Sequence, residues 1–296
     1  MKVKFWGVRG SIPSPGKDTM EVGGNTSCVE VRTDDGMLIV FDAGTGIRKL
    51  GLSLLKETFL KGGKVGHLFF SHTHWDHIQG FPFFAPAFIG SKDELRRPVK
   101  DRTNMFHLYG AKKVFERLEN TLKGQMEYQY FPIDLDSMGA AIHFHEIQET
   151  PLHLGQSIIT PKHLNHPNGV LSFRVENETG DKVVVYATDT EHYQDGELDV
   201  NVLKIADQAN VFIYDAMYTP EEYAGDPVTR QGSKIGWGHS TWLEGTRLAK
   251  AAQAEKLILF HHDPDHADAF LRDIEKQAQA HFPNTMLAVE GLELEL

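Results

Sequence analysis

A chain of 296 residues is long enough for one large domain or two ordinary ones, and its 41% hydrophobic residues exclude a disordered protein. The 30 Lys and Arg residues against 41 Asp and Glu give a net charge of −11, which argues against a protein that grips a long nucleic acid through its phosphates. Cys28 is the single cysteine, so an internal disulfide and a cysteine-based zinc site are both excluded.

The first residues of the chain alternate like a strand and lack the apolar core of a signal peptide. No apolar run reaches the roughly 18 residues that are needed to cross a bilayer. The sequence therefore predicts a cytoplasmic protein without a membrane association.

The first 70 residues favour strands, which we expect at 3–8, 27–33, 37–41 and 65–70. The glycine-rich turn 42–46 leads into a predicted helix at 47–59. Further strands are expected at 141–147, 157–162, 170–175, 183–187, 211–214, 257–260 and near 286–290.

Helices are predicted at 111–123, 202–209 and 242–253, and the segment 219–239 has the composition of a long loop. Asp263 resembles an N-cap with Pro264 at the first helical position, which predicts a helix to about His281. We find neither a repeat nor a linker. The order of elements predicts a single domain over residues 1–296, with two packed sheets and helices outside them.

Four metal-ligand side chains fall within six residues, directly after an apolar strand: His72, His74, Asp76 and His77. An extended loop points His72 and His74 to one side, where they can hold one ion. The turn that follows lets Asp76 and His77 reach a second ion, as two-metal hydrolases require. A solvent-exposed polar loop is the alternative, and the density of the cluster disfavours it.

Two ions need more ligands, and three further residues stand at or soon after the end of an apolar strand: His166, Asp189 and His261. Asp189 has two carboxylate oxygens and can bridge two cations. His163 competes with His166 for one ligand position, and His262 competes with His261 for another. Both neighbours stay open as alternatives.

This order of residues resembles the metallo-β-lactamase superfamily, and within it the branch of tRNase Z and the cyclic phosphodiesterases. The motifs that carry the resemblance are Asp42-Ala43-Gly44, His72-x-His74-x-Asp76-His77, His166, Asp189 and His261. The resemblance spans nearly the whole chain. It implies an α/β fold, a four-layer αββα sandwich with two metal ions at one edge of the sheets.

By the same resemblance, one ion is held by His72, His74 and His166, and the other by Asp76, His77 and His261, with Asp189 between them. Zn²⁺ is the expected metal and Mn²⁺ the alternative. His239-Ser240-Thr241 matches a motif of the tRNase Z branch, and Asp215 stands where that branch has a glutamate. We therefore expect His239 to donate a proton to the leaving group and Asp215 to support it.

Two more aspartates have expected roles. Asp76, near the attacking water, is expected to orient it or take its proton. Asp42 in the glycine-rich turn is expected to hydrogen-bond a metal-ligand histidine, with a plain turn residue as the alternative.

The expected substrate is a small cyclic or short linear phosphodiester, attacked by hydroxide bound between the two metal ions. tRNase Z carries a long RNA-gripping arm between the third-motif histidine and the bridging aspartate, and the stretch from His166 to Asp189 is too short for one. Processing of tRNA 3′ ends is therefore disfavoured. Hydrolysis of a lactone, thioester or other carboxyl-type bond is the alternative function.

The apolar segment 81–86 has three open interpretations, namely a wall of the substrate pocket, hydrophobic core, or the contact of a homodimer. Arg9, Arg230 and Lys234 fall in expected loops, where a solvated surface charge is favoured over a phosphate contact. The remaining histidines are assigned to strand faces and solvent, among them His143, His145 and His153.

Overall fold

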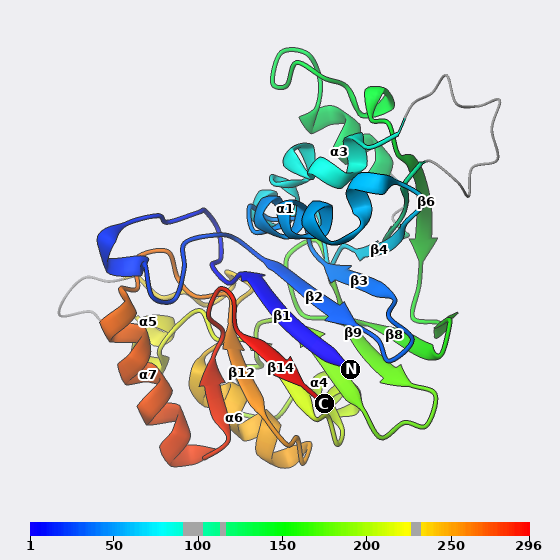
Figure 1. Cartoon of the computed structure of the whole chain (residues 1–296). Helices are drawn as coiled ribbons and strands as arrows, with labels where there is room; N and C mark the ends of the chain where they lie inside the picture. Colours follow the sequence, from blue (N-terminus) through cyan, green and yellow to red (C-terminus); the bar gives the residue numbers. More distant parts are fainter. Residues whose placement is uncertain (91–102, 113–116, 226–231) are drawn as a thin grey trace.

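The computed structural model describes residues 1–90, 103–112, 117–225 and 232–296. Two seven-stranded sheets pack face to face, and helices cover their outer sides (Figure 1). The αββα sandwich expected from the sequence is confirmed. Among the described residues, no helix is both long and apolar enough to cross a membrane.

The first sheet contains, in spatial order, β14 (Glu293–Glu295), β1 (Lys2–Gly7), β2 (Cys28–Arg32), β3 (Leu38–Phe41), β4 (Val65–Phe69), β5 (Met105–Ala111) and β6 (Ala141–Ile147). The second contains β13 (Thr285–Leu287), β12 (Leu257–Phe260), β11 (Val211–Asp215), β10 (Val183–Ala187), β9 (Val170–Asn177), β8 (Ser157–Leu164) and β7 (Leu152–Leu154). Strands β3 to β6 are parallel, as are β10 to β13. The carboxyl ends of neighbouring parallel strands therefore meet at common edges.

The α-helices are α1 (Ile47–Glu57), α2 (Trp75–Ile78), α3 (Leu118–Gln125), α4 (Val200–Ala206), α5 (Pro220–Ala224), α6 (Trp242–Ala251) and α7 (Asp268–His281). Inward-facing residues of both sheets form one large core, and the outer face of the first sheet packs on α1 and α3 through a second. Phe41 stacks on Tyr186 across the sandwich, with ring centroids 5.1 Å apart. This aromatic layer supports the polar residues that follow β3 and β10.

One predicted helix is partly wrong. The sequence predicts a helix at 111–123, but Ala111 ends strand β5 and the helix begins at Leu118. Strand β5 was not predicted, although its residues alternate: Phe106 and Leu108 pack on the helices, whereas His107 and Tyr109 lie on the other face. The short strands β7 and β14 were also not predicted.

The start of the last helix differs from the prediction, because α7 begins at Asp268 rather than after Asp263. The Arg9 guanidinium donates hydrogen bonds to the carbonyl oxygens of Asp263 and His266, at 2.9 and 2.7 Å. Because these carbonyl oxygens bind Arg9, the residues around them do not join the helix. The Asp263 carboxylate instead accepts a hydrogen bond from the backbone N–H of Asp265, in a turn that precedes α7. Arg9 is fully buried, so its assignment to the surface is wrong.

The predicted loop 219–239 contains α5, which begins with a capping box between Thr219 and Glu222. Arg230 lies outside the described residues. In the apolar segment, Phe81 and Phe84 are buried in the helix-side core, which confirms the core interpretation for both. Phe83 of the same segment is exposed to solvent, and its role in a dimer contact stays a prediction.

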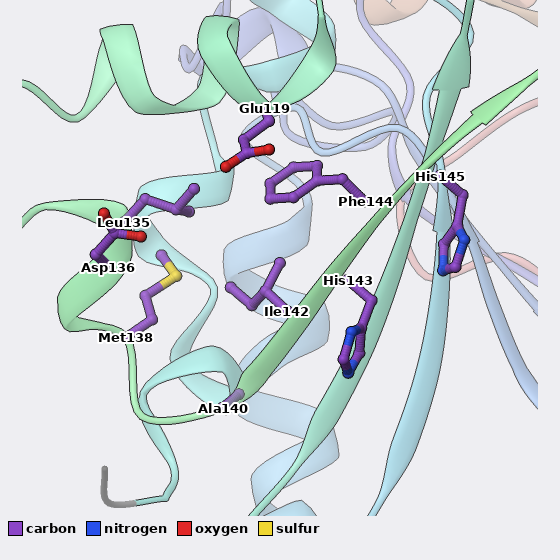
Figure 2. Close-up of a pocket in the computed structure, with 9 residues that line it drawn as sticks. All are labelled: Glu119, Leu135, Asp136, Met138, Ala140, Ile142, His143, Phe144 and His145. Atoms are coloured by element: carbon purple, nitrogen blue, oxygen red, sulfur yellow. The ribbon is translucent and has the colours of Figure 1, made fainter.

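A cavity of about 470 Å³ opens beside β6 and the segment 135–140. Ile142, His143, Phe144 and His145 all contribute to its lining, but the rings of His143 and His145 point to the other side of the strand from the side chains of Ile142 and Phe144 (Figure 2). There both histidine rings contact His107, with centroids 5.2 and 5.1 Å away. The assignment of these histidines to a strand face is confirmed, as is the exposure of His153 on β7.

His67 is the buried end of this row of histidines, and its Nδ1 lies 3.0 Å from the Tyr109 hydroxyl. Burial, and then the charges of His107 and His145, lower the pKa of His67 from 6.5 to about 4. As the pH falls, His67 is protonated in the unfolded chain before it is protonated in the folded protein. The contribution of His67 to the free energy of unfolding is therefore complete above pH 6.5 and is lost as the pH falls towards 4.

We expect the free energy of unfolding of the His67→Phe variant to fall less between pH 6.5 and 4 than that of the wild type, by up to about 3 kcal/mol. Phenylalanine keeps a ring in the stack but cannot be protonated. Urea denaturation at several pH values measures the difference. His153→Phe, at an exposed position of β7, should keep the wild-type dependence, and the same dependence in His67→Phe would contradict the assignment.

Candidate metal centre

The seven residues predicted as metal ligands all lie together at one edge of the two sheets. They come from the loop after β4, from α2, and from the segments after β8, β10 and β12. Their ligand atoms form two clusters that share Asp189, each with all atoms within 4.8 Å of one another: His72, His74, His166 and Asp189, and Asp76, His77, Asp189 and His261.

The two neighbouring histidines that competed for ligand positions lie elsewhere. His163 is exposed on β8, and its backbone N–H donates to Glu149. His262 is buried, but its Nε2 lies 2.9 Å from the carbonyl oxygen of Ala288. The structure therefore brings His166 and His261 into the clusters and leaves His163 and His262 out of them.

Asp189 offers one carboxylate oxygen to each cluster. Its Oδ2 lies 3.7 Å from Nε2 of His72 and 3.9 Å from Nε2 of His166. Its Oδ1 lies 3.2 Å from Nε2 of His77 and 3.3 Å from Nε2 of His261. This placement is what a carboxylate that bridges two ions requires.

The residues fit a pair of divalent cations. His72 Nε2 and His77 Nε2 are buried, and neither has a hydrogen-bond partner among the described residues, although both face the shared carboxylate. An unpartnered buried nitrogen is costly unless an ion occupies its lone pair. Burial lowers the pKa of His72 well below its usual value, so this imidazole is neutral and able to bind a cation. A set of imidazoles and carboxylates without a thiolate suits zinc and manganese alike.

Asp42 lies directly behind the cluster and holds one of its histidines. Its carboxylate accepts hydrogen bonds from the Ser71 backbone N–H and hydroxyl, both at 2.8 Å, and from the Tyr186 hydroxyl at 2.7 Å. His77 Nδ1 lies 2.7 Å from Asp42 Oδ2. The expected hydrogen bond between Asp42 and a histidine of the cluster is confirmed, and the role of His77 as a metal ligand stays a prediction. The bond leaves Nε2 of His77 to face the Asp189 carboxylate, where it could bind an ion.

We expect Asp42→Asn to weaken metal binding about 10- to 100-fold. The NH₂ group of the asparagine would face hydrogen-bond donors of Ser71, Tyr186 and His77, so the side chain would no longer fix the His77 ring. The free energy of unfolding should fall by about 2 kcal/mol or more for the same reason. Chelator competition and urea denaturation measure the two effects. Tyr186→Phe removes only one donor and should lose about 1 kcal/mol with little change in metal affinity. Equal effects of the two variants would contradict this arrangement.

Three residues of the site have a left-handed backbone: Asp42 with φ 58°, Asp189 with φ 54° and His261 with φ 62°. Each follows the carboxyl end of a strand and turns the chain away from the sheet there. A residue other than glycine pays on the order of 1 kcal/mol for this conformation. The neighbouring Gly10 allows the His261 ring to approach, because a Cβ at that position would lie 2.5 Å from the ring.

His239 and Asp215 form a buried pair beside the clusters. His239 Nδ1 lies 2.9 Å from Asp215 Oδ2, and the His239 ring is 4.9 Å from that of His261. Burial lowers the pKa of His239, but the charge of Asp215 and its hydrogen bond, followed by the charges of Asp189 and Asp76, raise it more, so the pKa rises to about 9. Asp215, which stands where the tRNase Z branch has a glutamate, therefore does reach His239.

Glu191 is a residue of the site that the sequence did not indicate. Its carboxylate accepts hydrogen bonds from the backbone N–H groups of Gly236 and Gly238, at 2.7 and 2.8 Å, and from the Tyr223 hydroxyl at 2.6 Å. The Gly238 carbonyl in turn accepts from Nδ1 of His166, at 2.7 Å. Glu191 thus fixes the loop that orients His166. In the sequence, only the position of Glu191 two residues after Asp189 indicates that it belongs to the site, and this is a weak indication.

Comparisons with known proteins agree with this geometry. A family model described as "Beta-lactamase superfamily domain" matches residues 38–262. Ribonuclease Z of Gemmatimonas aurantiaca is 25% identical over 332 aligned positions, which cover 99% of this chain and 95% of that protein. The metallo-β-lactamase fold protein YhfI of Bacillus subtilis has a TM-score of 0.68 at 20% identity, over 100% of this chain and 98% of its own. A diphosphatase of the PhnP family has a TM-score of 0.67 at 17% identity, over 100% and 97% of the two chains. The resemblance that the motifs indicated is confirmed.

Proposed function

The chain belongs to the beta-lactamase superfamily of metal-dependent hydrolases, and we propose that this member hydrolyses small cyclic or short linear phosphodiesters. The observation that carries the proposal is the His239–Asp215 pair beside the two clusters. An alkoxide that leaves a phosphodiester needs a proton, and a buried imidazolium held by a carboxylate can supply it.

We assign one ion to His72, His74 and His166, the other to Asp76, His77 and His261, and both to Asp189. When bound, two divalent cations neutralise the phosphoryl oxygens and make water a stronger acid, which allows an acidic protein to act on an anionic substrate. Zn²⁺ is the ion we expect, with Mn²⁺ as the alternative.

Asp76 is held in one orientation through one of its oxygens. Its Oδ2 accepts from the Ser11 backbone N–H at 2.8 Å and lies 3.1 Å from Nε2 of His261. We therefore assign to Oδ1 the role of orienting the attacking water and accepting its proton. His239 donates a proton to the departing oxygen from Nε2, because Nδ1 faces Asp215.

Small substrates are favoured over RNA. Between His166 and Asp189 the chain forms only β9, β10 and their short connections, which leaves no room for an RNA-gripping arm. The net charge of −11 also disfavours a long phosphate backbone. The ribonuclease Z name belongs to relatives of about one-quarter identity, and tRNA 3′ processing stays the less favoured alternative.

A substrate panel tests the proposal against hydrolysis of carboxyl-type bonds. Metal-loaded protein should turn over bis(4-nitrophenyl) phosphate with a higher kcat/KM than chromogenic lactones, thioesters or lactams. Asp189→Ala serves as the control for contaminating hydrolases. A clear preference for any of the carboxyl-type substrates would replace the proposal with its alternative.

The pH dependence of kcat should depend on the charge of Asp215. A general acid must be protonated, so activity falls as the pH rises through the pKa of His239, which is about 9. Asp215→Asn removes the charge that raises this pKa most, so the pKa falls and we expect the alkaline limb of kcat to move to lower pH. Phosphodiesters with alkyl leaving groups give the measurement. Asp207→Asn, at an exposed position, should keep the wild-type limb, and an unmoved limb in Asp215→Asn would oppose the pairing.

A further inference from the structure

Arg9 is a fully buried cation to which the proposed chemistry gives no role. Its Nε donates to the carbonyl oxygen of Gly23 at 2.8 Å, and its Nη1 donates to those of Asp263 and His266. Its Nη2 lies 3.9 Å from the Asp268 carboxylate. A buried ion pair is often no more stable than well-packed apolar side chains of similar volume. Stability of the fold alone therefore does not account for an arginine at this position.

The hydrogen bonds of Arg9 attach the segment 8–11, which follows β1, to the turn before α7. Backbone hydrogen bonds continue this attachment. The Gly10 N–H donates to the carbonyl oxygen of His262 at 2.9 Å, and the His262 N–H donates to that of Val8 at 3.0 Å. The segment 8–11 is therefore fixed beside the end of β12.

The same segment contacts two residues of the second cluster, which contains Asp76, His77, Asp189 and His261. The Ser11 N–H donates to Asp76 Oδ2 at 2.8 Å. Gly10 lies so close to the His261 ring that a Cβ on it would be 2.5 Å from the ring. Ser11 has a left-handed backbone with φ 59°, which a residue other than glycine keeps only where its surroundings fix it. The position of the segment 8–11 therefore bears directly on Asp76 and His261.

The first cluster is held from a different part of the chain. Its His166 Nδ1 lies 2.7 Å from the carbonyl oxygen of Gly238, in the loop that Glu191 fixes. Within the part of the chain that the structure describes, no hydrogen bond joins the segment 8–11 to a histidine of the first cluster. A change in the segment 8–11 can therefore disturb one cluster without the other.

We propose that Arg9 is a positioning residue for the second metal ion. It holds the segment 8–11 where the Ser11 N–H orients the Asp76 carboxylate and where Gly10 packs on the His261 ring. The inference rests on the proposed function for the assignment of an ion to the second cluster, and on the contacts of the segment 8–11 for the role of Arg9. Its consequence is selective, because loss of the guanidinium weakens the second site and spares the first.

Metal affinity in proteins with a single remaining site tests this selectivity. His166→Ala removes a ligand of the first cluster only, and His261→Ala removes a ligand of the second only. Competition with a chromogenic chelator measures Zn²⁺ binding in each background, with and without Arg9→Met. We expect Arg9→Met to weaken Zn²⁺ binding about 10- to 100-fold in the His166→Ala protein. In the His261→Ala protein the affinity should not change.

Arg174 on β9 provides a matched control. Its Nη1 also donates to two backbone carbonyl oxygens, those of Ile205 and Asp207, at 2.9 and 2.7 Å. Arg174→Met therefore loses bonds of the same kind and should change Zn²⁺ affinity in neither background. Should Arg9→Met fail to fold, Arg9→Lys supplies the same comparison, because lysine keeps the charge but has one donor atom in place of the planar fork.

The possible outcomes separate the inference from the proposed function. Equal weakening of Zn²⁺ binding in both backgrounds would show general damage and overturn the role of Arg9. Unchanged affinity in both would also overturn it and leave the proposed function standing. Selective weakening in the His166→Ala background, in a protein whose wild type hydrolyses no phosphodiester, would support the role of Arg9 and overturn the proposed function.

Discussion

Asp189→Ala is expected to lose both metal ions. Its two oxygens face separate clusters, so one substitution removes a ligand from each. It also removes the negative charge that lies between two cations, whose mutual repulsion then rises. We expect elemental analysis to find close to two ions in the wild type and almost none in the variant after dialysis against a weak chelator.

Matched variants separate this effect from general damage to the protein. Asp181→Ala, at an exposed turn, should keep both ions. His166→Ala should lose mainly one ion, whereas His163→Ala, at an exposed position of β8, should keep two. An Asp189→Ala protein with two ions at unchanged affinity would show that the carboxylate does not bridge.

His239→Ala is expected to bind metal normally and to lose about 10²- to 10⁴-fold in kcat on substrates with poor leaving groups. The side chain touches Asp215 and stacks near His261, but its role is to protonate the departing oxygen rather than to bind an ion. The loss should be largest for alkoxide leaving groups. It should shrink for 4-nitrophenolate, which departs with little help from an acid.

The comparison of leaving groups distinguishes proton donation from packing. A histidine that only holds its loop in place would affect both substrate types to the same extent. Equal losses, or a loss of metal in His239→Ala, would reject the role. Asp215→Asn should behave as a milder version of the same defect, because it lowers the pKa of His239 without removing the imidazole.

The ligand cluster could be read from the sequence because its chemistry is local. His72, His74, Asp76 and His77 follow one apolar strand within six residues, which is a density of ligand-type side chains that an ordinary polar loop does not need. The more distant members were found by one rule, that polar residues after apolar strands meet at a sheet edge. This rule located His166, Asp189 and His261 because β10 and β12 belong to the same parallel set, and β8 joins that sheet.

What the sequence did not reveal depends on contacts between distant segments. Helix α7 begins later than predicted because of Arg9, a residue more than 250 positions earlier that donates hydrogen bonds to the carbonyl oxygens of Asp263 and His266. Glu191 acquires its role from two backbone N–H groups of a loop that local pattern cannot place beside it. Neither interaction leaves a periodic or compositional trace in the chain.

The left-handed backbone at Asp42, Asp189 and His261 has a consequence for engineering and for evolution. Glycine is the residue that adopts this conformation without strain, and at each of these positions it would delete a side chain of the metal site. At Asp42 the four hydrogen bonds of the carboxylate outweigh this strain, so selection for stability keeps the aspartate even without metal. At Asp189 and His261 the buried side chains face each other and the clusters, so a selection for thermal stability in the absence of metal would act against the metal site at these two positions first.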